Sequence, residues 1–407
     1  MRQIEGGVTA AKGFMAASTE ARIKYSGRED LVLLYAESPC TAAGVFTRNQ
    51  VKAAPVLWDR ALIDQERQVR AVVINAGIAN ACTGKEGEGV CKKTAQETAR
   101  LLGIDSEEVL IASTGVIGMQ IPFDKLKTGL LPMKRMLSPE LEAGNRAAKA
   151  IMTTDTHEKE CAVQFFVDGI SCTLGGMAKG SGMIHPDMGT MLSFVTTDAA
   201  ISRELLQKAL SDVVEDTFNM ISVDGDTSTN DTLLVLANGA SGAKRIEEEG
   251  PAYEIFREAL FFVCAHLSQM LAGDGEGATA LFEVIVKGAD TREHARTLAK
   301  SVITSSLTKA ALFGHDANWG RILCALGYAG VPFDPEQVSL TITSANGTLD
   351  IFANGCALDF DDATAALILS AEKVTAICDM HAGSEEACAW GCDLSYDYVK
   401  INADYRS

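Results

Sequence analysis

The sequence predicts an α/β protein in which buried strands and helices alternate along the chain. Hydrophobic residues make up 47% of the 407 positions and charged residues 22%, which suits a folded protein and excludes global disorder. Short apolar runs of strand length alternate with stretches whose apolar residues recur every three or four positions. No linker, short repeat or low-complexity segment interrupts this order. The pattern favours α/β or α+β layers over all-α or all-β folds.

The expected strands are apolar runs bounded by turn residues. In chain order they are 31–35, 71–74, 109–112, 161–167, 170–174, 191–196, 233–237, 281–286 and 338–342. The fourth and fifth runs flank Asp168-Gly169, which is a strong signal for a hairpin turn. The expected helices are the stretches with helical spacing, namely 92–102, 141–152, 204–216, 252–272 and 361–372.

Charge and cysteine usage limit the class of function. The chain has 36 basic and 54 acidic residues, a net charge of -18, which repels nucleic-acid backbones and anionic membranes. Eleven cysteines show no disulfide spacing, so we expect reduced, mostly buried thiols and a cytoplasmic protein. Residues 1–18 lack the apolar core of a secretory signal. The apolar stretch 259–271 is too short to span a bilayer and predicts a buried helix.

The most unusual segment runs from 175 to 190, where five glycines surround Lys179 and Thr190 opens the next apolar run. One interpretation is a glycine-rich loop followed by an ordinary β-forming threonine. The other is a nucleophile. Threonine needs an adjacent base, which its own α-amine would supply if the chain were cut after Gly189. A free α-amine has a pKa of about 7.7–8.0 and is available as a base near neutral pH.

At this point the sequence resembles a known family. Residues 179–184 and 188–192 resemble the self-cleaving segment of the ornithine acetyltransferase (glutamate N-acetyltransferase) family of arginine biosynthesis. Other blocks resemble the same family in its own order over essentially the whole chain, namely 75–84, 113–118, 152–156, 224–231, 274–279, 318–322, 390–393 and 401–407. Gly189 stands where the family often has alanine, which is a sterically mild change.

The resemblance implies a layered α-β-β-α fold and a chain that cuts itself between Gly189 and Thr190. Residues 1–189 would form an α chain and residues 190–407 a β chain, assembled as two of each. Thr190 would take the acetyl group of N-acetylornithine and pass it to glutamate, a ping-pong transfer through an acetyl-enzyme. Thr114, through its hydroxyl, and Gly115, through its backbone N–H, would form the oxyanion hole.

The family's substrate-binding positions share one feature, which is a polar or charged side chain able to hold an amino acid. They correspond to Thr153, Lys179, Thr190, Glu276, Asn402 and Ser407. From the residues alone, Lys179 and Glu276 also fit an ordinary solvated base and acid, and the terminal pair fits a frayed end. No cofactor or metal is expected. Members of the family differ in whether acetyl-CoA also serves as donor, so both activities stay open for this chain.

Two other functions compete with the transferase. The first is a self-cleaving threonine amidohydrolase or aminopeptidase, which passes the acyl group to water. The second is a ligand-binding protein of the same fold, which predicts an uncut chain. A zinc site at Cys378, His381, Cys388 and Cys392 is disfavoured, because the spacing matches no usual structural-zinc pattern.

Overall fold

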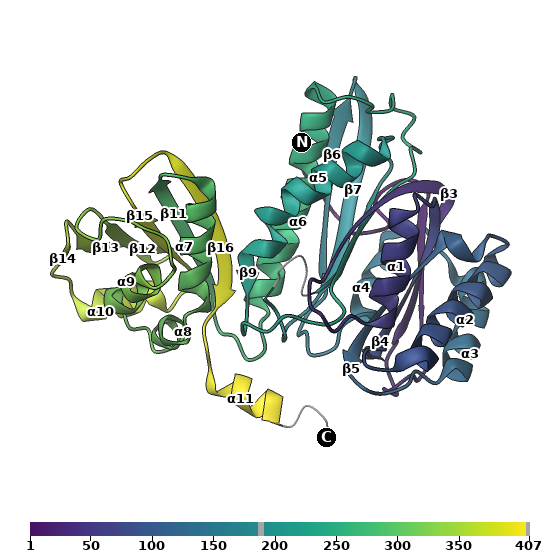
Figure 1. Cartoon of the computed structure of the whole chain (residues 1–407), viewed down its shortest axis with the longest axis horizontal. Helices are drawn as coiled ribbons and strands as arrows, with labels where there is room; N and C mark the ends of the chain where they lie inside the picture. The colour runs from purple at the N-terminus through teal and green to yellow at the C-terminus, as the bar shows by residue number, and fades with distance from the viewer. Residues whose placement is uncertain (186–190, 404–407) are drawn as a thin grey trace. The chain divides into compact units, whose positions relative to one another are not determined.

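The computed structural model describes residues 1–185 and 191–403 (Figure 1). They form two compact units. Unit 1 contains Met1–Gly180, Pro186–Glu215 and Thr227–Leu267, and unit 2 contains Ser181–His185, Asp216–Asp226 and Ser268–Ser407. The expected mixture of helices and strands is confirmed in both units. Unit 1 contains nine paired strands that fall into two parts joined by one long strand, and unit 2 contains a seven-stranded sheet.

The sheet of unit 1 is built around the long strand β3. Its order is β1-β6-β7-β8-β10-β3-β4-β5, and β2 also pairs with β3. The strands are β1 (Arg2–Ile4), β2 (Phe14–Thr19), β3 (Leu31–Phe46), β4 (Val69–Ile78), β5 (Val109–Val116), β6 (Lys159–Val167), β7 (Ile170–Lys179), β8 (Leu192–Thr197) and β10 (Thr232–Ala237). The first part of β3 pairs with β2 and β4, whereas its last six residues pair with β10. Because of this division, β3 belongs to two sheets. One contains β1, β6, β7, β8, β10 and the end of β3, and the other contains β2, the start of β3, β4 and β5.

These two sheets of unit 1 enclose a common core. Alternate residues of β7, β8 and β10 enter it from one sheet, and alternate residues of β2, β3, β4 and β5 enter it from the other, as the two-residue period of strands requires. Examples from the first sheet are Met177, Phe194 and Leu234, and from the second Val32 and Ile74. This core is the central β-β contact of the predicted layers.

Helices cover the outer faces of both sheets in unit 1. On the β2–β5 side, α2 (Gly84–Leu102) and α3 (Phe123–Met136) pack on the opposite faces of β3, β4 and β5. On the β7–β8 side, a Cβ added at Gly176 would meet Val195 of β8 and Val263 of α6 (Pro251–Gly273). The predicted α-β-β-α layering is therefore confirmed within this unit. Other helices of unit 1 are α1 (Ala54–Asp64), α4 (Leu141–Ala150) and α5 (Arg203–Glu215).

The hairpin of β6 and β7 extends five residues beyond the expected end of its second strand. Val167 pairs with Ile170 across Asp168 and Gly169, which both have positive φ, as the turn signal predicts. The pairing then continues through Gly175 and Gly176 to Lys179, although these glycines read as a loop in the sequence. A Cβ on Gly175 would lie 2.1 Å from the Gly7 carbonyl oxygen, so this strand needs glycine for a close backbone approach.

Unit 2 is a second sheet with helices. Its strand order is β14-β13-β12-β15-β11-β16-β9. The strands are β9 (Ile221–Ser222), β11 (Leu281–Ala289), β12 (Ser339–Ser344), β13 (Gly347–Ala353), β14 (Cys356–Ala357), β15 (Lys373–Asp379) and β16 (Glu385–Cys392). The helices are α7 (Arg292–Thr304), α8 (Ser306–Phe313), α9 (Trp319–Gly327), α10 (Asp362–Leu369) and α11 (Tyr396–Ala403).

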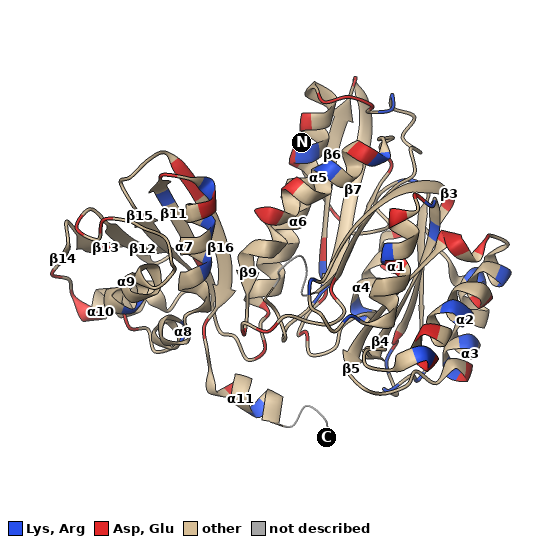
Figure 2. Ribbon diagram, in the orientation of Figure 1, with Lys and Arg blue, Asp and Glu red and all other residues tan. Residues whose placement is uncertain are grey.

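The structure shows where the charged residues, the most apolar helix and the cysteines lie. Figure 2 shows acidic and basic residues interspersed along the ribbons of α2 and α3. Within the described ranges, α6 is the one helix long and apolar enough to cross a membrane, and 56% of its most apolar window is buried. A core helix has the same properties, in line with the buried helix expected at 259–271. The eleven cysteines are free thiols, seven of them buried, as expected.

Candidate active site

Three predicted site residues of unit 1 meet around one ammonium group. Lys179 is the last residue of β7, and its Nζ lies 2.8 Å from the Thr153 Oγ1 and 3.2 Å from the Thr114 Oγ1. The Lys179 side chain is 9% exposed, so this charge is largely withdrawn from water. An ammonium has three donors and no acceptor, which fixes the direction of both bonds. Each threonine oxygen accepts from Lys179, and each hydroxyl proton is directed away from it.

Gly115 follows Thr114 at the end of β5, where the backbone of β4 comes very close. Gly115 pairs with Gly77, and both have positive φ, +125° and +103°. A Cβ on Gly115 would lie 2.2 Å from the Gly77 carbonyl carbon, which no side chain tolerates. Glycine is required here because the two strand ends turn in contact with each other. The positive φ of Gly115 sets the direction of its peptide next to the Thr114 hydroxyl.

A buried ion pair lies behind Lys179. Asp155 and Lys159 both have fully buried side chains, and their Oδ1 and Nζ atoms are 2.7 Å apart. The same Oδ1 accepts from the Gly180 amide at 2.6 Å, and Oδ2 accepts from the Thr153 amide at 3.0 Å. Burial alone would raise the pKa of the Asp155 carboxyl, but the charges of Lys179 and Lys159 outweigh it and hold this pKa well below its ordinary value.

A second polar network holds the end of β5. Asn230 donates from Nδ2 to the Ser113 carbonyl at 2.8 Å and to the Ala79 carbonyl at 2.6 Å. From the other side, the Ser113 hydroxyl donates to Asn75 Oδ1 at 2.7 Å. All four residues are at least 93% buried, so their hydrogen bonds are shielded from water. This network fixes the peptide that leads directly into Thr114.

Asp231 adds a buried carboxyl on the same side of unit 1. It is 1% exposed, and burial raises its pKa well above the ordinary value, against the opposing charge of Lys179. Its carbonyl oxygen accepts from the Thr47 amide at 3.0 Å, and the next residue, Thr232, donates from its amide to Met191. The start of β10 is thus tied to the residue that precedes β8.

The described part of β8 begins beside Lys179. Leu192 is in register with Lys179 in the antiparallel β7–β8 pair. The expected nucleophile Thr190 and the expected cleavage residue Gly189 lie outside the described residues, immediately before this strand. The remaining predicted residues of the oxyanion hole and of the substrate site in unit 1 are brought together by the fold.

Unit 2 brings two other predicted residues together. Asn402 donates from Nδ2 to Glu276 Oε2 at 2.7 Å, and the Glu276 side chain packs against Gly182. Glu276 is 6% exposed, so it is a buried acid and not a solvated one. The Glu276 amide donates to the Ser181 carbonyl at 2.9 Å. Asn402 is exposed, and its Nδ2 hydrogen bond links it to Glu276, while Ser407 lies outside the described residues.

The loop that carries Glu276 is fixed by the segment after β16. Asp393 accepts from the Thr279 amide at 2.8 Å and from the Thr279 hydroxyl at 2.6 Å. Ser395 donates to the Gly277 carbonyl at 2.5 Å. Two sequence blocks that are more than one hundred residues apart are therefore adjacent in unit 2. Sequence reasoning gave no role to Asp155, Lys159, Asn230 or Asp393, although each falls in or near a block that it singled out.

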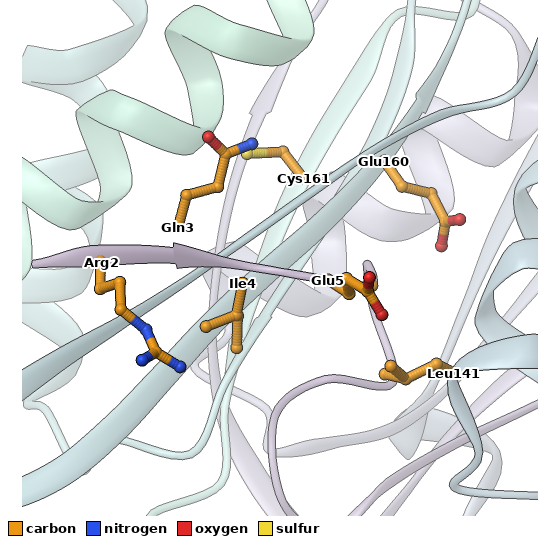
Figure 3. Close-up of a pocket in the computed structure, with 8 residues that line it drawn as sticks. Arg2, Gln3, Ile4, Glu5, Leu141, Glu160 and Cys161 are labelled. Carbon is orange, nitrogen blue, oxygen red and sulfur yellow. The ribbon is translucent and has the colours of Figure 1, made fainter.

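Two other features of the structure bear on the site. A pocket of unit 1 lies at the start of the chain and is lined by Arg2, Gln3, Ile4, Glu5, Gly6, Leu141, Glu160 and Cys161 (Figure 3). Of the predicted site residues that the structure describes, none lines this pocket. Across the described residues there is no group of three or more histidine, cysteine or acidic side chains placed to hold a metal.

The fold and the clustered side chains together define a layered α-β-β-α protein with a buried ammonium–hydroxyl site beside a glycine turn. A family model described as the ArgJ family matches residues 15–407, and the chain belongs to that family. A relative from Symbiobacterium thermophilum, named arginine biosynthesis bifunctional protein ArgJ, is 50% identical over 100% of both chains.

A further relative and a solved structure carry the same name. ArgJ 1 of Clostridium acetobutylicum, also named an arginine biosynthesis bifunctional protein, is 50% identical over 98% of this chain and 97% of its own. The crystal structure of the argJ protein from Bacillus halodurans is 43% identical, with a TM-score of 0.49, over 52% of this chain and 97% of that one.

Proposed function

We propose that this protein is an acetyltransferase of arginine biosynthesis that moves the acetyl group of N-acetylornithine to glutamate. Family membership supports this function, as does the name of its full-length relatives. The observation that carries the proposal is the contact of Lys179 with Thr114, beside the Gly115 turn and in register with the start of β8. A hydroxyl and a peptide N–H at such a turn are the donors that an acyl-transfer oxyanion needs.

The proposed nucleophile is Thr190, freed by autocatalytic cleavage after Gly189. Thr190 is two positions before Leu192 in the sequence. Leu192 pairs with Lys179, whose ammonium contacts Thr114. Its place in the sequence, just before a strand that pairs with Lys179, supports Thr190 as the nucleophile. Its own α-amine would act as the base for the hydroxyl.

The proposed reaction has two acyl-transfer steps. The Thr190 hydroxyl attacks the acetyl carbonyl of N-acetylornithine, and the α-amine takes its proton. The negative charge on the carbonyl oxygen is held by the Thr114 hydroxyl and the Gly115 N–H, and the C–N bond then breaks as ornithine leaves with a proton. The α-amine of glutamate attacks the acetyl ester in the second step, which gives N-acetylglutamate and restores Thr190.

The substrate contacts divide by charge. We assign Thr153 and Lys179 in unit 1, and Glu276, Asn402 and Ser407 in unit 2, to the amino-acid substrates. The buried ammonium of Lys179 suits a carboxylate, and the buried carboxylate of Glu276 suits an ammonium group. Asn402 holds Glu276 in place through a 2.7 Å hydrogen bond. No cofactor is required. Acetyl-CoA is proposed as a second acetyl donor, which the word bifunctional in the names of the relatives supports.

The first experiment is the intact mass of the purified protein under denaturing conditions. We expect two fragments that meet between Gly189 and Thr190, and a single 43.2 kDa chain for Thr190→Ala. Ser193→Ala is the matched control, because Ser193 is a buried hydroxyl three positions along that donates to the Met177 carbonyl. This control should be cut like the wild type. An uncut, folded wild-type protein would contradict the mechanism.

The second experiment measures product formation by the cut protein from N-acetylornithine with and without glutamate. N-acetylglutamate should form faster than free acetate, and glutamate should be required for turnover. Faster release of acetate would support the amidohydrolase alternative instead. The same assay with acetyl-CoA as donor tests the second activity. Native mass spectrometry tests the assembly, for which we propose two α and two β chains in the cytoplasm.

A further inference from the structure

We propose that the charge of Lys179 makes the Thr114 hydroxyl a stronger hydrogen-bond donor to the oxyanion, and that the buried Asp155–Lys159 pair positions Lys179 for this role. This inference rests on the proposed transferase function. It gives Lys179 a role in the transition state in addition to substrate binding. Asp155 and Lys159 are then positioning residues, although neither takes part in the reaction described above.

The effect of Lys179 on Thr114 depends on the direction of the hydrogen bond between them. The 3.2 Å contact can run only from the ammonium to the Thr114 oxygen, because an ammonium cannot accept. The Thr114 proton is therefore directed away from Lys179. A hydroxyl that accepts from a cation is polarised and becomes a stronger donor, and the effect is greatest where water is excluded. Lys179 thus strengthens the one bond that Thr114 gives to a developing negative charge.

Asp155 holds the Lys179 ammonium in place through several contacts. Asp155 is linked at once to the Gly180 amide after Lys179, to the Thr153 amide and to Lys159. Its Oδ2 lies 4.0 Å from the Lys179 Nζ and supplies a buried negative charge. Lys159 also donates to the His157 carbonyl at 3.3 Å and is fully buried. One carboxylate therefore fixes both the backbone beside Lys179 and the threonine on its other side.

The charge balance explains why two lysines share one aspartate. Two buried carboxyls of unit 1, Asp155 and Asp231, interact electrostatically with the Lys179 ammonium, and Lys159 shares Asp155 with it. Burial raises the pKa of Asp231 and favours its neutral form, so of these two carboxyls Asp155 is the one that stays charged. Lys179, Lys159, a charged Asp155 and a neutral Asp231 together carry a net positive charge, and this charge suits a site where negative charge develops.

A double-mutant cycle tests whether Lys179 works through Thr114. Thr114→Val should lower kcat by about 10²–10³-fold, the usual cost of one oxyanion donor, with Thr114→Ser restoring most of the rate. Lys179→Met should lower kcat about tenfold or more in the wild type, but less than about threefold when Thr114 is already valine. An equal loss of kcat in both backgrounds would overturn the proposal. A loss confined to KM would leave only the substrate-binding role.

A second measurement keeps the test valid where a variant is cut poorly. In the Thr190→Ala background every variant should be one chain, and the ¹³Cε resonance of Lys179, identified by its loss in Lys179→Met, reports its titration. Asp155→Asn should shift this titration to lower pH, because the counter-charge is gone. Asp198→Asn is the matched control, since Asp198 is 2% exposed and accepts from the Thr173 and Lys12 amides elsewhere in the unit.

The outcomes separate this inference from the proposed function. An unchanged Lys179 titration in Asp155→Asn, or the same shift in Asp198→Asn, would overturn the positioning role whether or not the protein transfers acetyl groups. In cut enzyme, Asp155→Asn should lower kcat increasingly as the pH rises, because Lys179 then loses its proton. A purely structural role for Asp155 would lower activity evenly at every pH. If the titration shifts as expected but no acetyl transfer is found, the proposed function fails alone.

Discussion

Replacing Gly115 by alanine tests the tight turn that places the expected oxyanion donors. A Cβ at this position would lie 2.2 Å from the Gly77 carbonyl carbon and 2.3 Å from its oxygen. Both are backbone atoms of the neighbouring strand, so they cannot move aside as a side chain can. The φ of +125° adds a conformation that side chains rarely adopt. Gly115→Ala must therefore separate the ends of β4 and β5.

The size of the effect follows from two separate costs. A strained φ costs about 1–3 kcal/mol for a residue other than glycine. Forcing a methyl group into a packed position costs about another 1–3 kcal/mol. Gly118→Ala is the matched control, because Gly118 also has positive φ, +84°, but a Cβ added there would meet no atom within 4 Å. It should carry only the first cost, so the two variants should differ by about 1–3 kcal/mol.

Two assays measure this difference. Urea unfolding in the Thr190→Ala background, where the chain should stay in one piece, should give a lower midpoint for Gly115→Ala than for Gly118→Ala. Acetyl transfer by the cut proteins should fall about 10²–10³-fold for Gly115→Ala, because its N–H moves from the oxyanion position. Gly118→Ala should stay within a few-fold of the wild type. Equal midpoints and equal rates in the two variants would refute the close contact of Gly77 and Gly115.

Three further predictions concern buried groups of the fold. Asp59 accepts a hydrogen bond from the Ile111 amide through Oδ1, and burial raises the pKa of its carboxyl. Its contribution to stability is therefore present below about pH 4, the pKa in the unfolded chain, and is lost as the pH rises through the higher pKa of the folded protein. Asp59→Asn keeps an oxygen acceptor and should raise the urea midpoint at pH 8 while flattening its dependence between pH 4 and 8; a steeper dependence would contradict this. Asn230→Ala removes hydrogen bonds to two buried carbonyls and should cost about 2–6 kcal/mol in urea unfolding, far more than Asn238→Ala, whose bond to the Lys12 carbonyl is exposed. Iodoacetamide at pH 8, followed by peptide mass mapping, should label the exposed Cys82, Cys324 and Cys356, but not the thiols whose pKa burial raises to about 12, which are Cys40, Cys91, Cys161 and Cys378.

The nine strands expected from the sequence coincide with observed strands, but the largely buried strands β2, β15 and β16 and several helices were not predicted. Runs such as 71–74 and 109–112 are entirely apolar and lie inside β4 and β5, as expected. Helix α2 begins at Gly84, eight residues before the expected start at 92, because three glycines in its first turns weaken the helical signal. Helix α3 was missed, and it contains Pro132 in its interior. Such breaks in propensity are overridden by packing of the apolar face on the sheet.

The candidate site was predictable only in part. Lys179, Thr114 and Thr153 are far apart in the chain, so their contact follows from the fold and from the family resemblance, not from spacing. Asp155 and Lys159 look like surface charges in the sequence, and only the structure shows that they are buried as a pair. The residues expected to react, Thr190, and to complete the substrate site, Ser407, lie outside the described residues, so their roles stay predictions.

The position of β8 and β10 in the sheet has a consequence for the two pieces that cleavage after Gly189 would produce. These two strands belong to the second piece, yet β7 and β3 of the first piece flank them on either side. The strands of the first piece are divided by the β8–β10 pair, which is all that the described residues of the second piece contribute to the sheet of unit 1, and the central core takes side chains from both pieces. The pieces would therefore behave as an interlocked pair that folds once, before the cut. Separately expressed halves should fail to recombine, and the precursor should be the only form that can reach the native state.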